Sequence, residues 1–222
     1  ALILAGKILS NDCVLEKPGI KLSSDTTLRK RGCSEEYVSR AAHKLLGAFD
    51  SWQLNVQQKI CLDVGASTGG FTQVLLERGA KQVYALDVGH NQMHWKIRNN
   101  PSVTCMEGIN IRQSKSDLLP QQVDFICIDT SFISLKLVLP AALQFLKKES
   151  ELIALIKPQH EVQKKEVGKG GIVRDPVLHS RVCDEISKYA QSLGLIVKGL
   201  LESPVRGATG NKEFLIYLQS KK

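Results

Sequence analysis

The sequence predicts an α/β fold, in which a mostly parallel sheet carries helices on both faces. From about residue 61 to the C-terminus, strand-like apolar runs alternate with segments of helical spacing. Such alternation is typical of parallel strands joined by helical crossovers. A glycine-rich turn also follows the first of these strands, at Gly65, where folds of this class hold ligands. With 222 residues, the chain has room for one such domain and a small additional module.

Short apolar runs indicate the expected strands, and apolar residues three and four positions apart indicate the expected helices. We expect strands at residues 59–64, 82–87, 103–106, 123–128, 151–156, 195–201 and 214–218. We expect helices at residues 37–49 with Ser34 as N-cap, and at residues 71–78, 91–98, 137–146 and 177–193. A turn-rich stretch joins the last two strands, which predicts a hairpin at one edge of the sheet.

The N-terminal part has a different pattern. Residues 6–12 and 17–22 each predict a turn between short strands. We therefore expect residues 1–32 to form a small β-rich module and residues 33–222 to form the α/β domain.

The strongest local motif is LDVGASTGGF at residues 62–71, at a strand-to-helix turn. It departs from the dinucleotide fingerprint G-x-G-x-x-G, because Ser67 stands at the second glycine position. Asp63 lies two residues before the first glycine, a feature of methyltransferase loops, where a carboxylate holds the amino group of a methionine moiety. Asp87 ends the next strand, where a carboxylate can accept hydrogen bonds from the ribose hydroxyls of an adenosine. The alternative is a glycine turn that binds nothing.

Seven motifs spread over nearly the whole chain form a distinctive set. They are YVSR (37–40), LDVGASTGGF (62–71), ALDVG (85–89), DTSFIS (129–134), IKPQ (156–159), GKGGIVRD (168–175) and GATGNKEF (207–214). Together they resemble the TlyA (haemolysin A) family of FtsJ-like ribose methyltransferases. The resemblance implies a Rossmann-like sheet preceded by the latter part of an S4 RNA-binding module. The family usually has glycines after YVSR's serine and arginine, whereas this chain has Ala41 and Ala42. Because alanine is also small, we expect only a slight local shift.

The resemblance implies a catalytic tetrad of Lys44, Asp129, Lys157 and Glu213. A ribose hydroxyl is a weak acid and needs a positioned base or firm orientation. We expect Lys157 to accept the proton or orient the hydroxyl, Lys44 to position the substrate, and the two acids to hold the lysines. Burial and a second cation would favour a neutral Lys157, whereas the carboxylates would favour the charged form, and the sequence leaves this balance open. Taken singly, Lys44 or Glu213 could equally be a surface charge.

S-adenosylmethionine is the cofactor that the resemblance implies. The residues expected to bind it come from the glycine loop, from the ends of the next strands and from the tetrad. They are Asp63, Gly65, Ala66, Ser67, Thr68, Gly69, Gly70, Phe71, Asp87, Val88, Asn110 and Asp129.

The charge balance favours a polyanionic partner. The chain carries a formal net charge of +8 at pH 7, and basic surfaces bind nucleic acid by releasing phosphate counterions. Residues 159–174 are expected to form a mobile basic loop over the active site, the alternative being a solvated charged loop. The expected RNA-binding residues are Arg40, Lys164, Lys165, Lys169 and Arg174. The resemblance implies ribosomal RNA as substrate, alone or within a ribosomal subunit, with a cytidine ribose as acceptor.

Composition argues against several other classes of protein. No apolar run approaches the roughly 20 residues of a membrane helix, so we expect no membrane partner. The six cysteines form no CxxC pair and the histidines show no metal spacing, which predicts reduced thiols in a cytoplasmic protein without a metal site. We expect a monomer or weak oligomer. Three alternatives stay open: a methyltransferase for a non-RNA acceptor, a haemolysin-like membrane-active protein, and an RNA-binding module with a degenerate pocket.

Overall fold

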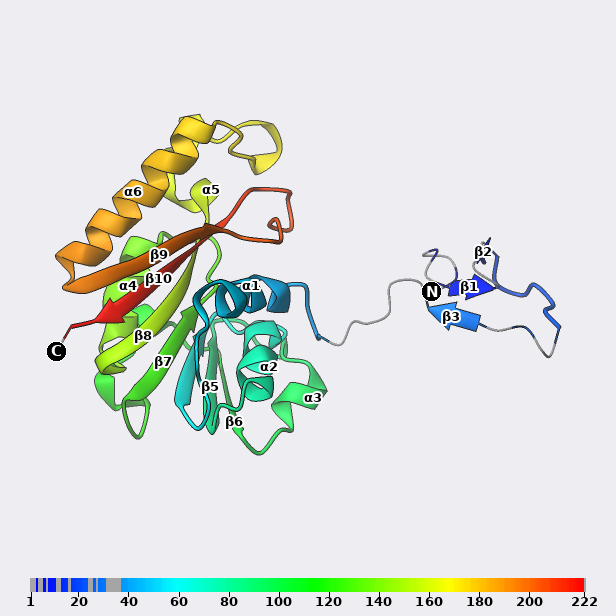
Figure 1. The fold of residues 1–222 in the computed structure, drawn as a ribbon, viewed down its shortest axis with the longest axis horizontal. Helices are drawn as coiled ribbons and strands as arrows, with labels where there is room; N and C mark the ends of the chain where they lie inside the picture. The colour runs from blue at the N-terminus through cyan, green and yellow to red at the C-terminus, as the bar shows by residue number, and fades with distance from the viewer. Residues whose placement is uncertain are drawn as a thin grey trace. The chain divides into compact units, whose positions relative to one another are not determined.

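The computed structural model describes residues 3, 6, 8–10, 13–15, 17–23, 26, 28–30 and 37–221. The chain divides into two compact units, Ala1–Tyr37 and Val38–Lys222 (Figure 1). The expected boundary at residues 32 and 33, and the expected N-cap Ser34, lie outside the described residues.

The N-terminal unit contains a small antiparallel sheet. Strands β1 (Ile8–Ser10), β2 (Cys13–Val14) and β3 (Leu28–Lys30) pair in the order β2-β1-β3. The turn expected at residues 6–12 is therefore wrong, because β1 occupies its centre and Leu9 pairs with both Val14 and Arg29. The bend and turn at residues 17–19 agree with the second expected turn.

The second unit is built on a seven-stranded sheet in the order β6-β5-β4-β7-β8-β10-β9. Its strands are β4 (Ile60–Val64), β5 (Gln82–Asp87), β6 (Val103–Glu107), β7 (Val123–Ile128), β8 (Leu146–Ile156), β9 (Leu195–Glu202) and β10 (Phe214–Ser220). Strands β4 to β8 pair in parallel, and β10 is antiparallel to both of its neighbours. The predicted hairpin at one edge is thus confirmed as β9 and β10.

Helices cover both faces of this sheet, which confirms the predicted fold class. They are α1 (Ala42–Trp52), α2 (Gly70–Glu77), α3 (Trp95–Arg98), α4 (Leu135–Leu143), α5 (Pro158–Glu161) and α6 (Pro176–Ser192). The chain crosses from β4 to β5 in one direction along the sheet and from β7 to β8 in the other. Because such crossovers are right-handed, α2 and α4 lie on opposite faces. Helix α1 packs beside α2, and α4 packs beside α6 (Figure 1).

The central strands are buried on both faces. All side chains of β7 from Phe125 to Ile128 are fully buried, which explains why this strand is a continuous apolar run rather than an alternating one. Phe49 of α1 is also buried, and its ring centroid lies 6.2 Å from that of Phe125. This contact anchors α1 to the middle of the sheet.

Three expected helices have different bounds. The segment 91–98 is helical only at α3, because the carboxylate of Glu107 accepts hydrogen bonds from the backbone N–H groups of Asn91 and Gln92 at 2.8 and 3.0 Å and holds them in a loop. Helix α1 begins at Ala42 rather than at residue 37. Helix α4 ends at Leu143, and Leu146 already begins β8, which pairs with Val123 of β7.

Replacing Phe49 by alanine should lower the free energy of unfolding by about 3–5 kcal/mol, because the change leaves a cavity between α1 and β7. Phe49→Leu, which keeps most of the volume, should cost less than about 1.5 kcal/mol. Urea unfolding followed by circular dichroism measures both. Equal costs for the two variants would show that α1 does not depend on this contact.

Candidate active site

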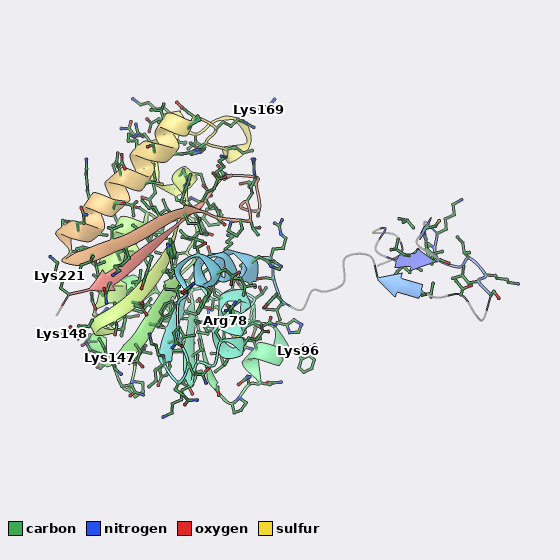
Figure 2. All side chains as sticks on the ribbon, in the orientation of Figure 1. Arg78, Lys96, Lys147, Lys148, Lys169 and Lys221 are labelled. Atoms are coloured by element: carbon green, nitrogen blue, oxygen red, sulfur yellow. The ribbon has the colours of Figure 1, made fainter. Side chains whose placement is uncertain are left out.

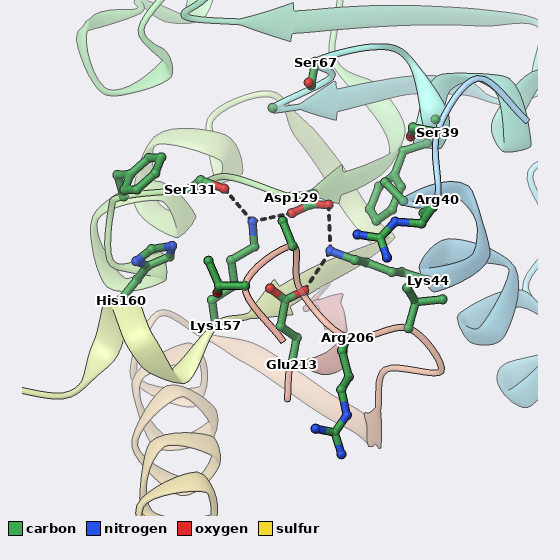
Figure 3. Close-up of a pocket in the computed structure, with 18 of the residues that line it drawn as sticks. Ser39, Arg40, Lys44, Ser67, Asp129, Ser131, Lys157, His160, Arg206 and Glu213 are labelled. Atoms are coloured by element: carbon green, nitrogen blue, oxygen red, sulfur yellow. Dashed lines mark hydrogen bonds and ion pairs between the residues drawn. The ribbon is translucent and has the colours of Figure 1, made fainter. Parts of the chain in front are cut away.

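A cavity of about 560 Å³ opens at the carboxyl ends of β4 and β7 (Figure 3). The strand order reverses between these two strands, and open α/β sheets bind ligands at such a reversal. The volume lies within the range of ligand pockets, about 300–1,000 Å³. Its walls come from the start of α1, the glycine loop after β4, the segments after β7 and β8, and the loop before β10.

The four expected catalytic residues meet in this cavity. Lys44 Nζ lies 2.7 Å from Glu213 Oε2 and 3.5 Å from Asp129 Oδ2. Lys157 Nζ lies 2.6 Å from Asp129 Oδ1. The side chains therefore form a chain of alternating charge in the order Lys157, Asp129, Lys44 and Glu213 (Figure 3). Lys157 follows β8, Asp129 follows β7, Lys44 lies in α1 and Glu213 precedes β10.

These charged side chains are almost completely buried. The exposed fraction is 8% for Lys44, 7% for Lys157 and 3% for Glu213. A buried charge is tolerated when it is paired and hydrogen-bonded. Here each carboxylate contacts a lysine and Asp129 contacts two, so the four formal charges sum to zero within the cluster.

Two polar contacts at the tetrad were not predicted from the sequence. Lys157 Nζ donates a hydrogen bond of 2.8 Å to Ser131 Oγ, and Gln159 Nε2 donates one of 3.5 Å to Glu213 Oε1. Both residues line the cavity. Both also lie inside motifs that we singled out, DTSFIS and IKPQ, so their position beside Asp129 and Lys157 was the available signal.

The glycine loop needs glycine for close approach. Gly65 has φ +87°, and a Cβ on it would lie 2.5 Å from the carbonyl oxygen of Asp129. A Cβ on Gly70 would lie 2.3 Å from Ser39 Oγ. The loop therefore packs directly on the end of β7 and on the start of α1. Ala42, one of the two alanines that depart from the family pattern, is fully buried as the first residue of α1.

Six residues of the glycine loop that were expected to bind the cofactor line the cavity, as does Asp129. They are Gly65, Ala66, Ser67, Thr68, Gly70 and Phe71. Gly69 is the N-cap residue of α2 and is not among the lining residues.

Asp63 lies beneath the loop rather than in the cavity wall. It is fully buried, and its Oδ2 accepts a hydrogen bond of 2.7 Å from Thr72 Oγ1. Its Oδ1 has no hydrogen-bond partner among the described residues. Burial raises the pKa of Asp63 to about 7, although the hydrogen bond from Thr72 opposes this rise.

The expected adenosine-side residues lie at the same sheet edge but outside the cavity lining. Asp87 accepts hydrogen bonds from the backbone N–H groups of Ser67 and Gly89, at 2.8 and 2.7 Å, and so ties two loops together. Val88 is 66% exposed. Asn110 accepts a hydrogen bond of 3.1 Å from the backbone N–H of Arg112 and caps a short 3₁₀ turn.

This arrangement fits S-adenosylmethionine. The unpaired buried Oδ1 of Asp63 is an acceptor that a positively charged amino group would satisfy. Gly65 keeps the space between the loop and β7 free of a side chain. Asp87, at the end of the next strand, offers a carboxylate to ribose hydroxyls. These three residues would hold the methionine and adenosine ends, with the tetrad beside the reacting methyl group.

The basic segment 159–174 forms ordered turns beside the cavity. Gln159, His160, Val167 and Gly171 line the cavity, whereas Lys164, Lys165, Lys169 and Arg174 are exposed and are not among its lining residues. The side chain of Asn211, which is fully buried, holds the segment: its Oδ1 accepts from the backbone N–H of Val173 and its Nδ2 donates to the carbonyl of Gly171, both at 2.9 Å.

Three further residues at the cavity mouth bear on substrate binding. Arg40, which was predicted, and Arg206, which was not, are exposed side chains that line the cavity (Figure 3). Phe132 is 93% exposed and has a positive φ of 61°, an unusual conformation for a bulky residue. The Phe132 ring lies 5.4 Å from that of His160, centroid to centroid. An exposed aromatic ring and two guanidinium groups that line one cavity are suited to stacking and phosphate contacts.

Other kinds of site are not evident in the described part of the chain. Within it, no group of three or more histidine, cysteine or acidic residues could hold a metal ion, and no helix is long and apolar enough to span a bilayer. The five described cysteines are free thiols, while Cys33 lies outside the described residues.

Comparison with known proteins agrees with this geometry. The family model for FtsJ-like methyltransferases matches residues 37–220. The chain belongs to the FtsJ-like methyltransferase family. Among its relatives, the 16S/23S rRNA (cytidine-2'-O)-methyltransferase TlyA of Mycobacterium tuberculosis is 42% identical over 99% of this chain and 82% of its own length. Hemolysin A of Brachyspira hyodysenteriae is 38% identical over 97% of this chain and 90% of its own.

A solved structure of this family shows the same fold. A protein from Streptococcus thermophilus, described as a hemolysin, has a TM-score of 0.85 and 41% identity over 99% of this chain and 81% of its own. The FtsJ-like assignment makes this chain a methyltransferase and gives S-adenosylmethionine as its methyl donor.

The raised pKa of Asp63 predicts a pH-dependent stability. Below its ordinary pKa of 3.8 the carboxyl is protonated in both folded and unfolded chains. As the pH rises toward about 7, the unfolded chain releases this proton and the folded chain keeps it, so the free energy of unfolding falls. Asp63→Asn should flatten this fall between pH 4 and pH 7 in urea unfolding. The exposed control Asp184→Asn should leave it unchanged, and an identical slope in all three proteins would contradict the assignment.

Proposed function

We propose that this protein transfers a methyl group from S-adenosylmethionine to the ribose 2'-hydroxyl of a cytidine in ribosomal RNA. The observation that carries the proposal is the buried tetrad, which lies in the same cavity as the glycine loop. One cavity can therefore hold both the methyl donor and the group that activates the acceptor.

Lys157 is the proposed base. Bound S-adenosylmethionine supplies an electrophilic methyl group on a sulfonium, and transfer is an in-line displacement by the acceptor oxygen. The oxygen–carbon bond forms as the carbon–sulfur bond breaks, and the hydroxyl proton passes to Lys157 Nζ, which enters the step as the neutral amine after releasing its own proton to solvent. Lys157 Nζ contacts Asp129 and Ser131, which leaves one of its tetrahedral directions open to the cavity that Lys157 lines.

Lys44 is proposed to position the ribose. Its Nζ is held by Glu213 at 2.7 Å and by Asp129 at 3.5 Å. Lys44 and Lys157 contact different oxygens of the Asp129 carboxylate, which keeps their two Nζ atoms apart. A hydroxyl or phosphate oxygen in the cavity can then contact Lys44 while the acceptor faces Lys157.

RNA is the proposed substrate because of the charge and shape around the cavity. Arg40 and Arg206 stand at its mouth, four basic side chains stand on the adjoining segment, and Phe132 offers a flat apolar face to an unstacked base. The names of the TlyA relatives specify cytidine in ribosomal RNA. An acceptor other than RNA has no comparable support at this cavity.

The remaining expectations belong to the same proposal. The small N-terminal sheet would act as an S4-like RNA-binding module on the ribosomal substrate, which is free RNA or an assembled subunit. The protein would work in the cytoplasm as a monomer or weak oligomer.

Lys157→Ala should reduce kcat by about 10²–10⁴, because the hydroxyl loses its base. The measurement is transfer of labelled methyl from S-adenosylmethionine to ribosomal subunits, followed by nuclease digestion and identification of 2'-O-methylcytidine. Cofactor affinity, measured by calorimetry, should change little. Near-normal turnover by the variant would rule out Lys157 as base, and absence of label with the wild type would count against the RNA substrate.

Neutralising the basic segment should weaken RNA binding and its salt dependence. In Lys164→Ala/Lys165→Ala/Lys169→Ala, the slope of log affinity against log salt should become less steep by roughly two to three, since each phosphate contact contributes just under one. Lys148→Ala/Lys188→Ala/Lys221→Ala makes the same change in charge as a control. Figure 2 shows Lys148 and Lys221 at the opposite end of this unit from Lys169. Equal slopes for the two variants would contradict a role for the segment.

A further inference from the structure

Ser131 stands out among the cavity residues because its hydroxyl contacts a tetrad lysine. Its Oγ accepts a hydrogen bond of 2.8 Å from Lys157 Nζ. It lies two residues after Asp129, whose Oδ1 is 2.6 Å from the same nitrogen. Unlike the tetrad residues, Ser131 is exposed to the cavity that it lines.

We propose that Ser131 is a positioning residue that aims the lone pair of neutral Lys157 at the acceptor hydroxyl. This inference rests on the proposed function and adds a fifth residue to it. The ion pairs of the four charged residues do not by themselves fix the direction of that lone pair.

A neutral lysine amine has two N–H donors and one lone pair, arranged tetrahedrally around the nitrogen. Ser131 Oγ accepts from one N–H, and the Asp129 carboxylate attracts the other by charge, with Oδ1 2.6 Å from Nζ but outside hydrogen-bond geometry. The lone pair then takes the third direction. With the Asp129 contact alone, no hydrogen bond would fix the rotation about the Cε–Nζ bond, and the lone pair would take several directions, only one of which suits proton transfer.

The same contacts serve the charged product. When the acceptor proton moves to Lys157 Nζ, the resulting ammonium keeps its hydrogen bond to Ser131 and its ion pair with Asp129, and has one new N–H facing the methylated oxygen. Ser131 gains and loses no proton in this step. The nitrogen therefore changes its charge without reorganising its partners, which keeps the barrier low.

Burial makes this orientation consequential. Lys157 is 7% exposed, so little water is available to replace a missing acceptor. Lys44 and Glu213 cannot replace it either, because the distances that the structure shows connect them to each other and to Asp129, rather than to Lys157. Among the described residues, Ser131 Oγ is thus the hydrogen-bond acceptor that the structure shows for Lys157 Nζ.

The test compares Ser131→Ala, Ser131→Thr and the distant control Ser192→Ala in methyl transfer to ribosomal subunits. Ser131→Ala should lower kcat by roughly tenfold to a hundredfold, the range expected for a misaligned catalytic group. The KM for RNA, the affinity for S-adenosylmethionine and the melting temperature should stay within about twofold or a few degrees of the wild type. Ser131→Thr, which keeps the hydroxyl, should restore most of kcat, and Ser192→Ala should match the wild type.

Three outcomes would overturn the proposal. A raised KM with unchanged kcat in Ser131→Ala would mean that the hydroxyl binds RNA directly. An unchanged kcat and KM, or failure of threonine to restore a lowered kcat in a folded variant, would mean that the hydrogen bond to Lys157 has no part in turnover.

A spectroscopic arm separates this proposal from the proposed function. In protein with ¹⁵N-labelled lysine side chains, the Lys157 Nζ signal is assigned by its loss in Lys157→Ala. Ser131→Ala should shift or broaden this signal, whereas Ser192→Ala should not. If the wild type methylates no RNA, the proposed function is wrong, but the Lys157 Nζ signal still shows whether Ser131 orders the amine. An unperturbed signal in Ser131→Ala would refute that ordering.

Discussion

The structure of this methyltransferase depends on a buried chain of alternating charges at one edge of its sheet. Asp129 is the central member, because its two oxygens contact lysines from different elements. No one of these charges is stable in the interior without its neighbours. The sheet strands β7, β8 and β10 and the helix α1 must therefore converge at this point, which is where the cavity forms.

The topology explains why the cluster lies beside the glycine loop. The strand order reverses between β4 and β7, so the loops that follow these two strands separate and leave a crevice. Gly65 lets the first loop contact the backbone of Asp129 at the crevice floor. The glycine loop and the charge cluster thus share one backbone contact, and a shift in either would move the other.

A second connection links the basic segment 159–174 to the cluster. Asn211 bonds to the segment that carries the exposed lysines, and it lies two residues before Glu213. Gly207 packs against the Glu213 carboxylate, where a Cβ would lie 2.4 Å from Oε1. The loop that ends at β10 therefore holds both the basic segment and one tetrad acid. The basic segment is thus connected through one loop to the acid that pairs with Lys44.

The sequence by itself determined the fold class and most strand positions, because apolar runs between glycine and proline are local signals. Strands β5 and β7 have the predicted bounds. Local signals failed where a distant side chain sets the backbone, as Glu107 does for residues 91–93. They also failed for the polar start of β8, which is a strand through its pairing partners rather than its composition.

For the site, family motifs indicated the four charged residues, but only the tertiary structure decided how they are connected. Lys44 and Glu213 are 169 positions apart, and nothing local shows that they form an ion pair. The fold also buries Asp63 beneath the loop, leaves its Oδ1 without a partner among the described residues and raises its pKa to about 7, none of which a local pattern indicates. The hydrogen bond from Lys157 to Ser131 likewise joins segments that follow two different strands. Residue type and spacing determine which groups are available, and burial and distance, which arise only on folding, decide what each group does.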